Sequence, residues 1–72
     1  MKEEFLKELG NRIRKIRLQK KMSQAELGRL SGKKYLSILR VEKGNINPSL
    51  IYLMELAEGL GTDLSTIVKG LP

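Results

Sequence analysis

Apolar residues recur along the chain with the spacing of amphipathic helices. Near the start they form one stripe with a period of about 3.6 residues, made up of Phe5, Leu6, Leu9, Ile13 and Ile16. This stripe predicts a helix over about 2–20. Gly10 lies inside it, where a glycine lowers helix stability slightly.

Capping residues and glycines mark two shorter helices in the middle of the chain. Ser23, with Glu26 three residues later, has the sequence pattern of a capping box. Gly32 supplies the left-handed residue that commonly ends a helix, so a helix is predicted between Ser23 and Gly32. A second helix is predicted over about 34–43, closed by Gly44.

The second half of the chain predicts two more helices. A loop over 45–49 precedes a helix whose N-cap is either Asn47, with Pro48 in the first turn, or Ser49. Gly61 ends this helix, whose apolar stripe is predicted to be buried and consists of Leu50, Leu53, Leu56, Ala57 and Leu60. A short last helix carries its own cap and apolar residues, which are Asp63, Leu64, Ile67 and Val68.

No segment has the alternating pattern of a strand, so the expected fold is all-α, a compact five-helix bundle in a single domain over 1–72. A chain of 72 residues lies near the lower limit for burying its own core. The expected core consists of Ile13, Ile16, Leu27, Leu30, Ile38, Val41, Leu53, Leu56 and Leu60. The sequence has no cysteine and no histidine, so we expect neither a disulfide nor a metal or other cofactor.

The net charge of +6 is concentrated in one part of the chain. Residues 12–43 carry eleven lysines and arginines against Glu26 and Glu42, while the segments on either side are slightly acidic. Such a concentration predicts a surface that faces a polyanion, with nucleic acid ahead of an anionic membrane. No apolar run could span a membrane and no signal peptide opens the sequence, so we expect a cytoplasmic protein.

Catalysis is not expected. The chain lacks the histidine and cysteine side chains that most often act as bases and nucleophiles, and Asp63 is its one aspartate. It also lacks a glycine-rich loop of the nucleotide-binding type.

Two short helices joined by a glycine turn within a basic block resemble the helix-turn-helix domain of phage repressors and Cro, shared by many xenobiotic-response-type regulators. The resemblance covers roughly 9–68, with the helix-turn-helix itself at about 23–43. The residues that carry it are Ile13-Arg14-Lys15-Ile16-Arg17, Ser23-Gln24-Ala25-Glu26-Leu27, Gly32, Ile38, Val41-Glu42-Lys43-Gly44, Asn47-Pro48-Ser49 and Leu56-Ala57. It implies a sequence-specific transcriptional regulator that binds a roughly palindromic double-stranded DNA operator as a homodimer.

The chain departs from the family pattern at four positions. Lys33 and Lys34 replace an apolar residue and a capping Ser or Thr, and Leu36 and Leu39 occupy outward positions that are more often polar.

The resemblance places the helix over 34–43 in the major groove, with Ile38 and Val41 facing the core. The side chains that would approach base edges are Tyr35, Leu36, Leu39 and Arg40. An arginine can bond guanine O6 and N7 or hold a phosphate, whereas a leucine reads only shape and thymine methyl groups. The expected phosphate contacts lie at the N-terminus of the preceding helix and in the flanking loops, and are Gln24, Lys33, Lys34, Lys43, Asn45 and Asn47.

Two further sets of residues are expected to serve structure and assembly. Arg17 lies about 40° around its helix from Ile13 and so borders the core stripe. The resemblance implies that it forms a buried or half-buried ion pair with Glu42. Four apolar residues of the C-terminal half are candidates for the dimer interface or, alternatively, for monomer surface, and are Ile51, Tyr52, Val68 and Leu71.

Leu36 and Leu39 also leave a second function open. Outward leucines on the recognition helix favour a protein-interaction module on the same fold, for an antitoxin or anti-regulator partner, or belong to the core. Structured RNA is a poorer target, because side chains cannot read the deep, narrow major groove of an A-form helix.

Overall fold

The computed structural model describes residues 2–71, which fold into five α-helices with no strand among them, so the all-α prediction is confirmed. The helices are α1 (Lys2–Gln19), α2 (Gln24–Ser31), α3 (Tyr35–Glu42), α4 (Leu50–Leu60) and α5 (Leu64–Val68). The two end positions of the expected 1–72 domain, Met1 and Pro72, lie outside the described residues.

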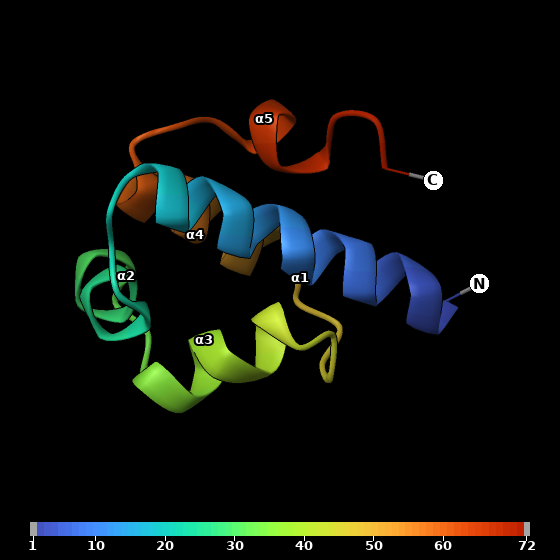
Figure 1. Ribbon diagram of the computed structural model, residues 1–72, viewed down its shortest axis with the longest axis horizontal. Coiled ribbons are helices and arrows are strands. Elements are labelled where there is room, and N and C mark those ends of the chain that lie inside the picture. Colours follow the sequence, from blue (N-terminus) through green and yellow to red (C-terminus); the bar gives the residue numbers. More distant parts are fainter. Residues whose placement is uncertain (1, 72) are drawn as a thin grey trace.

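The long helix α1 crosses the middle of the molecule (Figure 1). α3 lies on one side of α1 and α5 on the other, while α2 packs against both α3 and α4. Every helix contributes to the core, whose buried apolar residues are Leu6, Leu9, Ile13, Ile16, Leu27, Ile38, Val41, Leu53, Leu56, Ala57, Leu60 and Ile67.

Side-chain caps fix the starts of three helices. Ser23 Oγ accepts a hydrogen bond from the backbone N–H of Glu26 (3.0 Å) at the start of α2. Ser49, and not Asn47, caps α4, because Ser49 Oγ accepts from the N–H of Tyr52 (3.0 Å). Asp63 caps α5, and hydrogen bonds from the Thr66 hydroxyl and N–H hold the pKa of Asp63 below its ordinary value.

Two leucines predicted to be buried are exposed. Leu30 is 46% exposed, because the buried face of α2 is formed by Leu27 and Gly28, and Leu30 lies on the far side of Leu27 from Gly28. Leu50 is 62% exposed. It stands in the first turn of α4, about 120° around the helix from the fully buried Leu56, and therefore at the edge of the stripe.

Gly10 allows α1 and α3 to approach closely. A Cβ at Gly10 would lie only 2.4 Å from the backbone oxygen of Glu42 and 2.5 Å from that of Val41. The small loss of helix propensity at Gly10 therefore accompanies a contact that no larger residue could make, and α1 remains one continuous helix through it.

We expect Val41→Ala and Leu56→Ala each to lower the free energy of unfolding by about 2–4 kcal/mol, because both leave a cavity in a close-packed core. Urea denaturation measures the change. Leu30→Ala is the matched control and should change stability little, because that side chain is largely exposed. Equal losses for Leu30→Ala and Leu56→Ala would contradict this packing.

Candidate nucleic-acid interface

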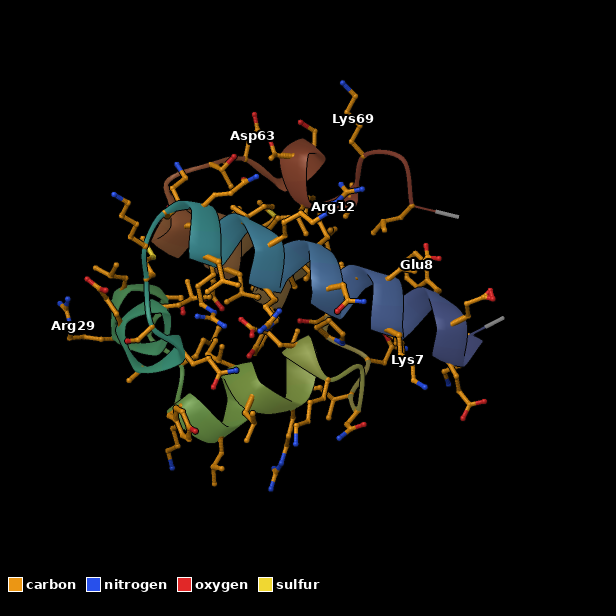
Figure 2. All side chains as sticks on the ribbon, viewed as in Figure 1. Lys7, Glu8, Arg12, Arg29, Asp63 and Lys69 are labelled. Atoms are coloured by element: carbon orange, nitrogen blue, oxygen red, sulfur yellow. The ribbon has the colours of Figure 1, made fainter. Side chains whose placement is uncertain are left out.

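Helix α3 buries one flank and leaves the other in solvent. Ile38 and Val41 are buried against the rest of the protein. Four side chains lie on the opposite flank. Tyr35, Leu36 and Arg40 are exposed, and Leu39 is half-buried. Figure 2 shows side chains that extend from α3 on the side away from α1.

A buried ion pair anchors the C-terminal end of α3. Arg17 Nε donates to Glu42 Oε2 (2.6 Å) and Arg17 Nη2 donates to Glu42 Oε1 (2.9 Å), so the guanidinium binds the carboxylate through two parallel hydrogen bonds. Only 7% of the Arg17 side chain and 2% of the Glu42 side chain are exposed. Both residues are thus largely withdrawn from any DNA that approaches the protein.

The same ion pair reaches the start of α2. Arg17 Nη1 donates to the backbone oxygen of Met22 (2.8 Å), and Gln24 Nε2 donates to Glu42 Oε1 (3.0 Å). α1, α2 and α3 therefore meet at one polar network. No side-chain polar atom buried in residues 2–71 lacks a hydrogen-bond partner.

The N-terminus of α2 lies beside this network. Gln24 is the first residue of α2, and Glu42 holds its side chain through a hydrogen bond. The side chain therefore lies at the N-terminal end of α2, where free N–H groups and the helix dipole attract an anion. Gln24, predicted to contact a phosphate, is thereby oriented from inside the protein.

The other predicted phosphate contacts divide into two groups. Four flank α3 with exposed side chains: Lys34 before it, and Lys43, Asn45 and Asn47 after it. Lys33 differs, because its Nζ bonds Glu55 on α4 and lies 4.5 Å from the centroid of the Tyr52 ring. Only 15% of the Lys33 side chain is exposed, so its charge is engaged within the protein.

Two lysines near this surface were not among the predicted contacts. Lys21 stands two residues before the N-cap of α2, and its φ of +59° lies in the left-handed region where glycine is favoured. Its position directly after the predicted first helix is the sequence signal that could have placed it near the start of α2. Lys7 lies beside the loop that follows α3, since a Cβ at Gly44 would stand 2.9 Å from Lys7 Cα (Figure 2). No local sequence pattern predicts that Lys7 lies beside Gly44, because the two residues are far apart along the chain.

The four candidate interface residues have different surroundings. Ile51 is 68% exposed and Val68 is 38% exposed. Tyr52 is half-buried, and its hydroxyl lies 2.6 Å from Ser37 Oγ, while Leu71 packs against the core.

Other exposed apolar residues lie next to Ile51. Leu50 and Met54 are exposed on the same side of α4, at the three- and four-residue spacings that bring side chains together on a helix. We call Leu50, Ile51 and Met54 the α4 face. The sequence pattern predicts Leu50 in the buried stripe of this helix and assigns no role to Met54.

None of the helices within residues 2–71 is long and apolar enough to cross a membrane. The same residues contain no group of three or more acidic, histidine or cysteine side chains placed to hold a metal ion.

Comparisons with known proteins give both a sequence match and structural matches. A family model described as helix-turn-helix (HTH_3) matches residues 13–67. The crystal structure of the restriction-modification controller protein C.AhdI from Aeromonas hydrophila is 34% identical, with a TM-score of 0.84, over 86% of this chain and 94% of that chain. No curated protein sequence matches the chain significantly.

Two further structures are similar at lower identity. The wild-type restriction-modification controller protein C.Esp1396I is 26% identical, with a TM-score of 0.83, over 90% of this chain and 86% of that chain. The clp gene regulator ClgR from C. glutamicum shares the fold at 22% identity, with a TM-score of 0.84, over 89% of this chain and 83% of that chain.

We expect Glu42→Ala to lower the free energy of unfolding by about 3–5 kcal/mol, because it leaves the buried Arg17 charge without its partner. The double change Arg17→Met/Glu42→Leu should cost less, because it removes both charges and keeps apolar volume. Chemical denaturation of the three proteins checks the order. An Arg17→Met variant that melts like the wild type but no longer binds DNA would show that Arg17 serves binding instead.

Proposed function

The chain belongs to the HTH_3 helix-turn-helix family of DNA-binding transcriptional regulators, which are not enzymes, and from this premise we propose that it binds a roughly palindromic double-stranded DNA operator as a homodimer. α3 is the recognition helix in this proposal and enters the major groove. The similarity to structures named as restriction-modification controller proteins supports a regulatory role.

The observation that carries the proposal is the exposed flank of α3 between two polar loops. The flank stands within the segment 12–43, where the positive charge of the chain is concentrated. Exposed Lys34 precedes α3, and Lys43 and Asn45 follow it, so a groove occupied by α3 brings a phosphate strand near each end. The concentrated positive charge and the exposed flank of α3 thus both favour double-stranded DNA as the ligand.

Base contacts are assigned to the exposed flank of α3 and phosphate contacts to its surroundings. Arg40 is the cation on this flank and can donate two hydrogen bonds to guanine. Leu36 and Leu39 favour thymine methyl groups, and Tyr35 offers a hydroxyl and a ring near the N-terminal end of α3. The proposed phosphate contacts are Gln24, Lys34, Lys43, Asn45 and Asn47.

Dimerisation follows from how little DNA one short helix can read. An eight-residue recognition helix contacts too few base pairs to select one site in a genome, so two copies are needed. A twofold dimer would set its recognition helices about 34 Å apart, one turn of DNA. The proposed interface comprises Val68 and the α4 face, because their large apolar side chains are exposed, and Tyr52 and Leu71 contribute only their accessible edges.

A protein partner for the outward flank of α3 is the second candidate function. The exposed Leu36 favours it, because leucine makes no hydrogen bond to a base edge. Selection of bound sites from random duplex DNA separates the two functions. Enrichment of a twofold-symmetric site, with affinity that falls steeply as salt rises, supports the regulator; no enrichment and a shallow salt slope would favour the protein partner.

We expect Arg40→Ala and Lys43→Ala to impair binding in different ways. Arg40→Ala should relax the preference at one base position and weaken operator binding by about 1–3 kcal/mol. Lys43→Ala should weaken operator and random duplex alike and reduce the salt slope by about one. Fluorescence anisotropy over a salt series measures both. Equal losses on every sequence for Arg40→Ala would make Arg40 a phosphate contact.

We expect Ile51→Glu/Val68→Glu to sediment as a folded monomer while the unchanged protein sediments as a dimer. Two carboxylates buried in a twofold interface would face their copies without a compensating charge. The monomer should also lose the preference for a full operator over a half-site. The control Leu18→Glu/Leu30→Glu changes the charge equally at exposed leucines of α1 and α2 and should remain dimeric. A dimeric Ile51→Glu/Val68→Glu protein would place the interface elsewhere.

A further inference from the structure

We propose that Lys33 serves DNA recognition as a positioning residue that holds the N-terminal end of α3, and that it does not contact a phosphate. Lys33, Ser37, Tyr52 and Glu55 act together, and we call these four residues the Tyr52 cluster. The inference rests on the proposed function, in which α3 reads the major groove.

The cluster begins with the capture of the Lys33 ammonium by α4. Lys33 Nζ lies 4.5 Å from the centroid of the Tyr52 ring and bonds the carboxylate of Glu55, three residues further along α4. A ring face and a carboxylate together hold one cation, and each attraction adds to the other. The aliphatic stem of Lys33 is covered as well, since only 15% of this side chain is exposed.

The Tyr52 hydroxyl extends the cluster to α3 itself. It lies 2.6 Å from Ser37 Oγ, in the first turn of α3. Tyr52 therefore binds both the residue before the N-cap of α3 and a residue inside that helix. α4 thus holds α3 at two successive points.

α3 needs such a hold because its own start is weak. Ser23, Ser49 and Asp63 cap α2, α4 and α5 through side-chain oxygens, whereas Lys34, the N-cap of α3, makes no side-chain cap hydrogen bond. A missing cap destabilises the first turn of a helix. In α3 that turn carries Tyr35 and Leu36, two of the proposed base-contact residues, so an unrestrained turn would displace them from the bases.

Loss of the Lys33 contacts is therefore expected to weaken binding to the operator but not binding to random DNA. Positioning matters where side chains must meet base edges, while binding to random DNA depends on the number of phosphates neutralised. A lysine that contacts a phosphate would influence both kinds of binding. The salt slope therefore distinguishes a positioning lysine from a phosphate-binding lysine.

The test compares Lys33→Met with Lys34→Met in the full chain. Both changes remove one positive charge and keep an unbranched apolar side chain, but only Lys33 belongs to the Tyr52 cluster. Lys33→Met should weaken operator binding by roughly tenfold and leave random-duplex affinity and the salt slope unchanged. Lys34→Met should weaken both DNAs and lower the slope by about one. A Lys33→Met protein that behaves like Lys34→Met, or like the wild type, overturns the proposal.

Amide hydrogen exchange tests the cluster without DNA. The N–H groups of Ser37 and Ile38 donate to the backbone oxygen of Lys34 (3.0 and 3.2 Å) and report on the first turn of α3. Lys33→Met should accelerate their exchange several-fold relative to Lys34→Met, with core amides unaffected. Unchanged exchange in Lys33→Met overturns the positioning role, whereas a wild-type chain that prefers no operator over random DNA overturns the proposed function.

A double-mutant cycle tests the hydrogen bond between α4 and α3. Tyr52→Phe keeps the ring under Lys33 and loses only the hydroxyl, and Ser37→Ala loses only the other partner. Each should reduce operator affinity several-fold, and the double variant should lose no more than either single variant. Fully additive losses would show that the two hydroxyls act separately and would overturn this part of the cluster.

Discussion

The bidentate pair between Arg17 and Glu42 sets the geometry on which the interface depends. It joins the helix that crosses the molecule to the last residue of α3, and through Gln24 and the carbonyl of Met22 it also fixes the start of α2. A buried ion pair is not a large source of stability by itself, because both charges lose their hydration. Its contribution is directional, since two parallel hydrogen bonds restrict how the two helices can be placed relative to each other.

α3 is consequently held at both of its ends by polar contacts. The ion pair holds the C-terminal end from α1, and the Tyr52 cluster contacts the N-terminal end from α4. Between them only Ile38 and Val41 anchor the helix in the core. An eight-residue helix would be marginal alone, so α3 depends on these contacts for its stability and placement.

The fold could be predicted from the sequence because its signals are local. The apolar stripes, the capping residues Ser23 and Asp63 and the glycines at helix ends each act within a few residues of one another. Burial could not be predicted as well: Leu30 and Leu50 match the helical period but lie at the edges of faces that only the packing of α2 and α4 defines. Lys33 shows the same limit, since its partners Tyr52 and Glu55 lie some twenty residues away along the chain.

The separation between the two flanks of α3 has an evolutionary consequence. Tyr35, Leu36 and Arg40 project into solvent, while the side chains that hold the helix in place point inward or sit at its ends. Substitution on the outward flank therefore carries little penalty in folding. Duplicated copies of such a gene could diverge rapidly in the DNA they recognise while retaining one scaffold, which makes this architecture a ready source of new regulatory connections.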